Sequence, residues 1–350
     1  MPVINKPNQH FDINLWTGTG SAGQVQTNSG SMQPDFVWIK NRSSTGGHWW
    51  SDSVRGAASY LSSQNTDAEA NSATGLSSFN SNGFTVGSDS WTGGNGATYV
   101  GWQWKAGGTA VTNTSGTITS QVSANPTAGF SIVAWTGNGS SSATVGHGLG
   151  AVPALIICKE RSAAAEYWHV KHKSTASNTN LFLNVQNGST SASSVGDGVL
   201  GDLSSSTTFG FATAGSPGNV VAVNENGVTN IAYCWSEVPG YSSFGTFSGN
   251  GASNGPFIYT GFKPKFFLYK ATSHSSDWWL LDGTRGPINS AGAYVFTNAN
   301  TAEGVESSWV DFVSNGIKLR GRTDPNTNGS DRTYIYMAFA ESPFKFANAR

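Results

Sequence analysis

Hydrophobic and polar positions alternate along this chain in short runs, and Gly, Asn and Ser separate the runs. This pattern is typical of β-strands joined by tight turns, because those three residues adopt the backbone conformations that turns need. In residues 98–104 (TYVGWQW), for example, Val100, Trp102 and Trp104 share one face, whereas the other face is mixed. A strand of this kind has one side in a core. The sequence therefore predicts an all-β fold.

The same succession of short motifs occurs three times, which is a strong sign of an internal repeat. Each copy opens on an aromatic strand that ends in Gly-x-Gly: residues 11–20 (FDINLWTGTG), 130–139 (FSIVAWTGNG) and 244–251 (FGTFSGNG). A Pro and an apolar strand ending in Lys follow: residues 34–40 (PDFVWIK), 153–159 (PALIICK) and 264–270 (PKFFLYK). Each copy closes on an alternating strand: residues 98–104, 229–235 (TNIAYCW) and 333–339 (TYIYMAF).

The spacing of the copies sets the expected domain organisation. The three Lys residues that end the apolar strands, Lys40, Lys159 and Lys270, lie 119 and 111 residues apart, which is the size of a β-domain. We therefore expect three tandem β-sandwich modules of the jelly-roll or lectin-like kind. Their expected limits are residues 1–108, 130–242 and 243–350, with a polar linker over residues 109–129.

Composition narrows the classes of function. Charged residues make up 11% of the chain and the net charge is −1, so no basic surface is available to attract nucleic acid. No apolar run approaches the ~18 residues of a membrane span, and the N-terminus lacks the apolar core of a signal peptide. The two cysteines, Cys158 and Cys234, exclude a disulfide scaffold, and the pattern favours two free buried thiols over a bridge.

Two glycine motifs resemble sites of known chemistry. Residues 18–23 fit the dinucleotide fingerprint, and residues 251–255 fit the nucleophile elbow of hydrolases around Ser253. Both motifs work only where a helix follows, and here a poor helix former and a strand follow. A hairpin turn is the favoured interpretation of the first motif. A nucleophilic Ser253 is disfavoured, and we expect no enzymatic activity.

Two sets of charged or titratable residues have both a structural and a chemical interpretation. Asp52 with Arg55 and Asp282 with Arg285 recur at equal spacing, which favours a turn held by side-chain hydrogen bonds over a catalytic pair. The three histidines of the second copy are expected to be solvent-exposed loop residues. A zinc site is disfavoured, because the spacing of the histidines does not direct them to one side. They are His147, His169 and His172. No metal or cofactor is expected.

A pair of adjacent aromatic residues follows the Lys strand in each copy. Neighbouring residues of a strand face opposite ways, so one ring of each pair should lie on the outer surface or be covered by a loop or a neighbour, and burial under the module's own loops is the favoured interpretation. Exposed aromatic rings are typical anchors of interfaces and also stack on sugars. The candidates for contact with a partner or a glycan are Trp49, Trp50, Tyr167, Trp168, Trp278 and Trp279.

Several segments together resemble virion structural proteins of marine tailed bacteriophages, which carry tandem copies of an uncharacterised β-domain. The resemblance rests on residues 106–120 (AGGTAVTNTSGTITS), 128–139 (AGFSIVAWTGNG), 146–150 (GHGLG), 334–344 (YIYMAFAESPF) and 348–350 (NAR). It implies a structural or tail-fibre-like role on the virion surface after synthesis in the host cytoplasm, and it brings no catalytic residues with it.

Two functions follow as expectations. The first is a non-enzymatic capsid decoration or cement protein, whose partners are the major capsid protein or tail components and possible further copies of the chain. The second is a tail-fibre or spike adhesin that binds host surface glycans through the aromatic pairs. A glycan depolymerase ranks below both, because such enzymes generally need paired carboxylates and no pair recurs between the copies. Neither favoured function involves nucleic acid or membrane insertion.

Overall fold

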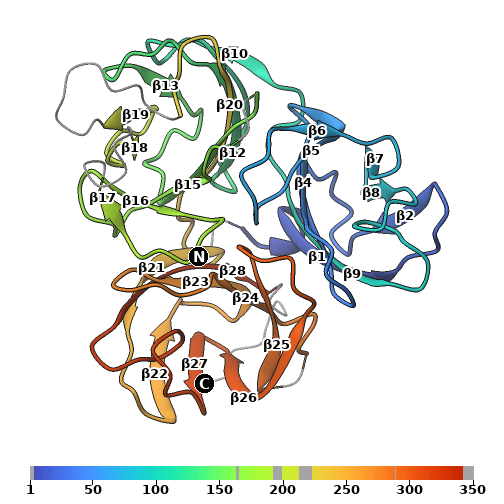
Figure 1. The fold of residues 1–350 in the computed structure, drawn as a ribbon, viewed down its shortest axis with the longest axis vertical. Helices are drawn as coiled ribbons and strands as arrows, with labels where there is room; N and C mark the ends of the chain where they lie inside the picture. Colours follow the sequence, from blue (N-terminus) through green and yellow to red (C-terminus); the bar gives the residue numbers. More distant parts are fainter. Residues whose placement is uncertain (1–3, 163–164, 192–198, 213–222, 288, 342–350) are drawn as a thin grey trace.

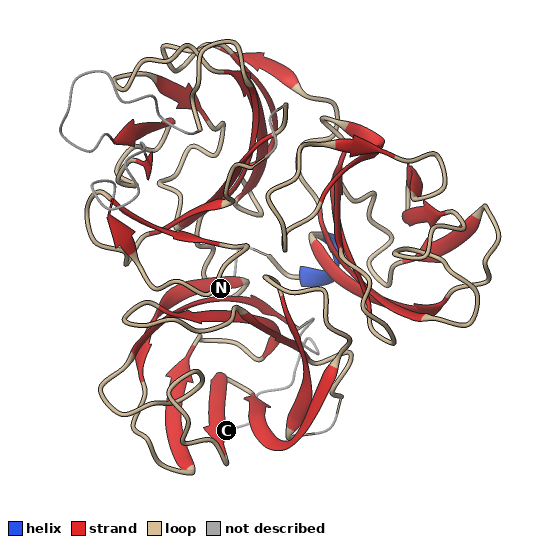
Figure 2. Cartoon of the chain, in the orientation of Figure 1, coloured by secondary structure: helices blue, strands red, loops and turns tan. Residues whose placement is uncertain are grey.

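The all-β prediction is confirmed. The computed structural model describes residues 4–162, 165–191, 199–212, 223–287 and 289–341, and in these residues the only helix is the short 3₁₀ turn η1 (Pro7–Gln9). Figure 2 shows strands and connecting loops throughout the chain. The Gly/Asn/Ser turns of the sequence supply the reversals between strands, and 15 glycines adopt the positive φ angles that such reversals use. Residues 342–350, which carry the end of the bacteriophage resemblance, lie outside the described residues.

The strands fall into three consecutive segments, which we call the first (β1–β9), second (β10–β20) and third (β21–β28) segments. The first holds β1 (Phe11–Thr17), β2 (Gln24–Thr27), β3 (Phe36–Asn41), β4 (His48–Asp52), β5 (Gly56–Leu61), β6 (Ala70–Asn71), β7 (Leu76–Asn80), β8 (Gly83–Val86) and β9 (Thr98–Trp104). The second holds β10 (Val111–Asn113), β11 (Ser120–Asn125), β12 (Phe130–Thr136), β13 (Thr144–Gly146), β14 (Leu155–Glu160), β15 (His169–His172), β16 (Thr179–Phe182), β17 (Thr190–Ser191), β18 (Val199–Leu200), β19 (Thr208–Ala212) and β20 (Thr229–Trp235). The third holds β21 (Ser242–Ser248), β22 (Asn254–Tyr259), β23 (Pro264–Ala271), β24 (Trp279–Asp282), β25 (Ala291–Phe296), β26 (Gly304–Val313), β27 (Gly316–Arg320) and β28 (Thr333–Ala340).

One strand order recurs in the three segments. The order β1-β9-β3-β4-β5 of the first segment returns as β12-β20-β14-β15-β16 and as β21-β28-β23-β24-β25. A second, smaller group of strands lies beside each of these: β2-β8-β7, β13-β19-β18 and β22-β27-β26. In the third segment both groups belong to one continuous eight-stranded sheet, which curls back on itself. The expected linker, residues 109–129, carries β10 and β11, which extend the second sheet beyond β12.

The register of the strands also repeats. Each Lys that ends an apolar strand pairs with the third residue of the closing strand: Lys40 with Val100, Lys159 with Ile231, and Lys270 with Ile335. All three lysines are fully buried, and each Nζ donates to the carbonyl of the following residue at 2.7 to 2.9 Å. Burial lowers the pKa of Lys40 and Lys159 to about 8 and that of Lys270 to about 7.

The three segments are arranged around a common centre (Figure 1). One face of each main sheet points inward, and a single apolar cluster draws residues from all three segments. Trp50 packs edge-on against Trp168 at 4.8 Å between ring centroids, and Phe11 stacks on Phe339 at 5.0 Å. The opposite face of each sheet packs on the smaller group of strands and forms a separate apolar cluster within its own segment. The three segments therefore share the central apolar cluster, whereas each segment also has an outer apolar cluster of its own.

Candidate functional site

The aromatic pairs singled out from the sequence are almost entirely inside the protein. Trp49, Trp50, Trp168, Trp278 and Trp279 are each at most 5% exposed. In the first and third pairs both rings are therefore covered, which agrees with the favoured interpretation and rules out the alternative of a ring on the outer surface. The reason is that both faces of these strands are covered. Trp50 faces the shared centre, whereas Trp49 faces the outer core and stacks on Tyr60 at 3.7 Å between centroids. These five rings hold the fold and offer no surface for a partner or a glycan.

Tyr167 is the remaining candidate, and it is 43% exposed. It precedes β15 rather than lying within it, because the second pair is offset by one residue from the other two. Strand pairing places Trp49 opposite Ile39, His169 opposite Cys158 and Trp279 opposite Tyr269. Trp49, His169 and Trp279 are therefore equivalent, and the residues just before them, His48, Trp168 and Trp278, are equivalent as well. Sequence comparison alone missed this offset because Trp168 matched a Trp in each of the other copies.

The three equivalent residues His48, Trp168 and Trp278 join each segment to its neighbour. Trp168 Nε1 donates to Ser62 O of the first segment at 3.0 Å, and Trp278 Nε1 donates to Phe182 O of the second at 2.8 Å. His48 completes the set: its Nδ1 accepts from Trp38, so Nε2 carries the proton and donates to Phe296 O of the third segment at 2.9 Å. The third segment therefore contacts the first as the first contacts the second, and the ring is closed.

A backbone hydrogen bond repeats at the same three seams. Glu69 N donates to Arg161 O, Ser189 N to Thr272 O, and Glu303 N to Arg42 O, each at 2.8 Å. Because the acceptors follow the three buried lysines at equal distances in the sequence, these bonds are equivalent by position as well as by length. The three seams share this backbone hydrogen bond and the side-chain bond of His48, Trp168 or Trp278, and in this respect the chain is a single-chain counterpart of a cyclic trimer.

Charged networks reinforce two of the seams. Asp52 Oδ1 accepts from the backbone N of Val54 and Arg55, which confirms the expected turn, and the Arg55 guanidinium binds Asp52 and Glu69. Tyr233 of the second segment donates to Asp52 at 2.8 Å, so this turn also spans a seam.

The third segment repeats this arrangement against the first. Arg285 binds Asp282 and Glu303, and Trp102 Nε1 donates to Asp282 at 3.1 Å. Arg161 and Arg42 close the two networks on Glu69 and Glu303. The sequence revealed the turns, but it did not reveal these partners, which lie up to 261 residues away.

The seam between the second and third segments differs. His172 occupies the position of Asp52 and Asp282, and a small apolar cavity remains there between the two segments. The cavity is lined by Leu155, His172, Leu268, Trp278, Ile335, Tyr336 and Met337. Burial lowers the pKa of His172 to about 3. This seam has no equivalent of the buried Asp–Arg pair among the described residues.

All three histidines of the second segment are buried, which corrects the expectation of exposed loop residues. His147, His169 and His172 are at most 2% exposed. His169 and His172 lie on strand β15, whose four residues are all buried because the strand has a core on each face. Burial lowers the pKa of His169 to about 3 as well. Cys158 and Cys234 are free buried thiols, as the sequence favours, and burial raises the pKa of both.

The buried histidines predict acid sensitivity. Between pH 6.5 and 3 the unfolded chain binds a proton at His169 that the folded chain does not, so stability falls as the pH falls. We expect His169→Phe, which keeps a ring at this site, to reduce the stability loss between pH 6.5 and pH 4.5 by about 2 kcal/mol. Urea midpoints of the wild type and the variant at both pH values measure this difference. An equal loss in the two proteins would contradict it.

The two glycine motifs are turns. Residues 18–23 form a turn between β1 and β2, but these strands pair with β9 and β8 in different sheets, so the turn is not the hairpin that the sequence favoured. Residues 251–255 lead into strand β22 rather than into a helix. Gly20, Gly139 and Gly251 have φ angles of 63 to 71° and occupy equivalent turns of the three segments. Each donates its N–H to a carbonyl of the loop that precedes the closing strand. These motifs therefore close loops in each segment.

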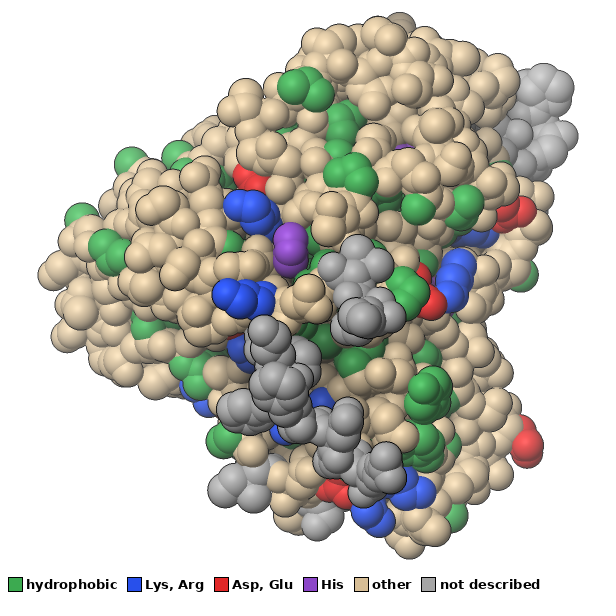
Figure 3. Space-filling model, turned by 180° about the vertical axis from the view of Figure 1, so that it is seen from behind, with side chains coloured by type: hydrophobic (Ala, Val, Ile, Leu, Met, Phe, Trp, Pro, Cys, Tyr) green, Lys and Arg blue, Asp and Glu red, His purple; other side chains and the backbone are tan. Residues whose placement is uncertain are grey.

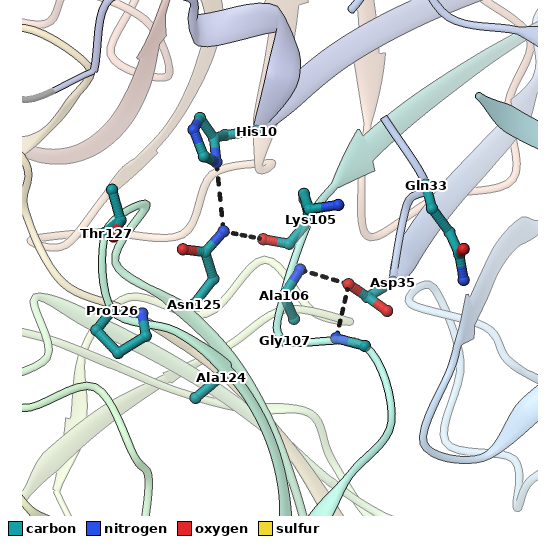
Figure 4. Close-up of a pocket in the computed structure, with 11 residues that line it drawn as sticks. His10, Gln33, Asp35, Lys105, Ala106, Gly107, Ala124, Asn125, Pro126 and Thr127 are labelled. Carbon is teal, nitrogen blue, oxygen red and sulfur yellow. Dashed lines mark hydrogen bonds between the residues drawn. The ribbon is translucent and has the colours of Figure 1, made fainter. Parts of the chain in front are cut away.

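One open pocket of about 460 Å³ lies where the first and second segments meet (Figure 4). Asn125 Nδ2 contacts His10 Nδ1 at 3.3 Å and donates to Lys105 O at 3.2 Å, and Asp35 Oδ2 accepts from Ala106 N at 2.8 Å. Burial raises the pKa of the Asp35 carboxyl. Among its lining residues Asp35 is the only carboxyl group, so the pocket lacks the paired carboxylates of a glycosidase. Its polar groups connect the chain segments that form its walls.

The surface carries little charge, and Figure 3 shows a few Lys, Arg, Asp and Glu side chains scattered over one face. Among the described residues, the exposed large apolar side chains are Leu15, Val25, Val111, Val152, Tyr167, Phe257, Tyr259 and Val305. Within the described part of the chain, no helix is long and apolar enough to cross a membrane. The same residues contain no group of three or more His, Cys, Asp or Glu side chains placed to hold a metal ion.

Comparison with known proteins gives one positive result. No curated protein and no solved structure matches the chain. A family model matches residues 6–343, and it spans the three segments and the closed ring that they form. Because that match covers nearly the whole chain, the protein belongs to the family described as Domain of unknown function (DUF7483).

Proposed function

We propose that this protein is a non-enzymatic structural protein on the exterior of a tailed-bacteriophage virion, most specifically a capsid decoration or cement protein. In this proposal each segment is a β-sandwich module, formed by its main sheet and its smaller group of strands. The resemblance of the sequence to virion structural proteins motivates the proposed location on a virion. The closed ring of three equivalent segments is the observation that carries the role.

The ring fits a particular kind of binding site. A protein shell built with icosahedral symmetry offers positions where three equivalent subunits meet, and a ring of three related segments presents one similar surface to each subunit. A single chain then bridges three neighbours and adds buried contact area between them, which stabilises the assembled shell. The weakly charged surface, rich in Gly, Ser, Thr and Asn, suits contacts that are not steered by strong charge.

Copy number tests this role. A decoration protein at three-fold positions is expected at tens to hundreds of copies per particle, whereas a tail component is present in a handful. Quantitative mass spectrometry of purified virions, with the major capsid protein as the internal reference, measures the ratio. A handful of copies per particle would refute the decoration role and leave a tail location.

The second candidate is an adhesin that binds host glycans, and exposed aromatic rings favour it. Phe257 and Tyr259 on strand β22 are 47% and 68% exposed, and Tyr167 is also exposed. Such rings stack on the apolar face of sugars. In an adhesin, Tyr259→Ala should weaken binding of the purified protein to host cells, whereas Val305→Ala, at another exposed apolar position, should not. Absence of binding by the correctly folded wild type would count against this function.

A further inference from the structure

A short loop crosses each of the three seams, and the three loops are equivalent. They follow β5, β16 and β25 and comprise residues 63–69, 183–189 and 297–303, which we call the first, second and third straps. The residue before each strap accepts the side-chain bond of Trp168, Trp278 or His48, and the last residue of each strap donates its backbone N–H across the seam. Each strap is therefore fastened to the neighbouring segment at both ends.

Polar contacts hold the third strap on the first segment. Ser63 Oγ donates to Thr297 O at 2.8 Å, and the Arg42 guanidinium binds both carboxylate oxygens of Glu303 at 2.8 and 2.9 Å. The strap itself (TNANTAE) carries no apolar side chain larger than that of alanine. Because segments with little apolar burial open locally at low cost, this strap can open while the aromatic centre of the ring stays packed.

His48 differs from its two equivalents because it can take up a proton. Its Nδ1 accepts from Trp38 Nε1 at 2.8 Å and its Nε2 donates to Phe296 O at 2.9 Å, so the neutral ring uses both nitrogens. A proton on Nδ1 would face the N–H of Trp38 and break that bond. Trp168 and Trp278 have indole rings, whose N–H only donates and does not titrate. Only the third strap is therefore fastened by a titratable ring.

The surroundings of His48 oppose its protonation while the strap is closed. Burial and the positive charges of Lys40 and Arg285 lower the pKa of His48 well below its usual value, and the backbone groups of Phe296 and Ala299 oppose this shift without reversing it. In an open strap water reaches the ring, which then titrates with its ordinary pKa near 6.5. The open form binds the proton and the closed form does not, so the closed strap loses stability as the pH falls below 6.5.

We propose that the third strap is an acid-released latch of the ring, which opens when His48 takes up a proton. The seam between the third and first segments suits this role because the chain does not run directly from one side of it to the other. Residues 105–110 connect the first segment to the second, and residues 236–241 connect the second to the third. Release of the third strap therefore loosens the ring at the seam that no connecting peptide holds. This inference goes beyond the proposed function and does not depend on it.

The first strap provides an internal reference for this latch. Glu69 at its end and Glu303 at the end of the third strap each bind two arginines in equivalent positions, so protonation of these carboxylates weakens both straps alike. At the first strap, Trp168 takes the place of His48. A difference between the two straps in their response to acid therefore reports on His48.

Hydrogen exchange of the full chain, followed by mass spectrometry at pH 6.5 and pH 4.5, tests the latch. After correction for intrinsic exchange rates, we expect the opening constant of residues 297–303 to rise by about 50-fold beyond any rise at residues 63–69, because the ring binds its proton only in the open form. His48→Gln should abolish this extra rise, since the Gln amide can donate to Phe296 O and accept from Trp38 without titrating.

Two further variants keep the test independent of a folding defect in His48→Gln. His48→Trp installs the residue of the other two seams and should also remove the extra rise at the third strap. His169→Phe, in the second segment, should leave the extra rise unchanged, because global unfolding exposes both straps equally. An equal rise at the first and third straps of the wild type would overturn the proposal. An extra rise that persists in folded His48→Gln or His48→Trp would overturn it as well.

Discussion

Residues 1–108 produced alone are expected not to exist as a stable folded monomer. In the full chain, the inward face of their sheet carries Phe36, Trp38, Trp50, Trp102 and Trp104, all buried against the other two segments. Each large aromatic ring buries roughly 150 to 250 Å² on folding, so separation from the second and third segments would expose an apolar face far larger than monomeric proteins usually tolerate. We therefore expect the fragment to aggregate or to associate with itself, while the full chain stays soluble.

Self-association of the fragment has a defined form. The first segment supplies the Glu side of one seam and the Arg side of another. Glu69 binds Arg161 of the second segment, and Arg42 binds Glu303 of the third. Since Arg42 and Arg161 occupy equivalent positions, Glu69 of one fragment can meet Arg42 of another, and a head-to-tail contact of this geometry closes after three copies. Size-exclusion chromatography with light scattering distinguishes aggregate, trimer and monomer. A monodisperse monomer with a cooperative thermal transition would contradict the shared core.

The strand content and the repeat were accessible from sequence because they depend on local and periodic signals. Alternating apolar positions and Asn-Gly or Gly-x-Gly turns identify strands without knowledge of their neighbours. Lys40, Lys159 and Lys270 mark equivalent positions in the sequence, and the structure pairs each of them with the equivalent residue of the closing strand. The sequence predicts a linker over residues 109–129 because β10 is an exposed polar edge strand, and because β11 carries Ser, Gln and Asn, residues that are common in loops.

The location of the aromatic rings was not accessible in the same way. Alternation along a strand shows that Trp49 and Trp50 point to opposite sides, but it does not show that both sides are covered. That result depends on the smaller group of strands on one side and on two other segments on the other, which are long-range contacts. The same holds for His169 and His172, whose polar character suggested exposure.

Replacement of Arg55 is expected to be the most damaging single substitution at a seam. The Arg55 side chain is fully buried and contacts Asp52, Glu69, the backbone carbonyl of Trp50 and the hydroxyl of Tyr233. Arg55→Met keeps much of the side-chain volume but leaves the Asp52 carboxylate buried without its cation. Removal of one partner from a buried ion pair typically costs about 3 to 5 kcal/mol, and we expect a loss of this size in the free energy of unfolding.

A matched substitution separates this effect from the mere loss of an arginine. Arg320→Met breaks the ion pair of Arg320 with Asp311, but that guanidinium is 46% exposed, so the expected loss is below about 1 kcal/mol. Arg285→Met should reproduce the Arg55 result, because Arg285 makes the equivalent contacts at the seam between the third and first segments. Urea unfolding followed by tryptophan fluorescence measures all three variants. If Arg55→Met cost no more than Arg320→Met, the seam networks would be incidental. The closed ring would then rest on the aromatic centre, the three repeated backbone hydrogen bonds and the hydrogen bonds of His48, Trp168 and Trp278.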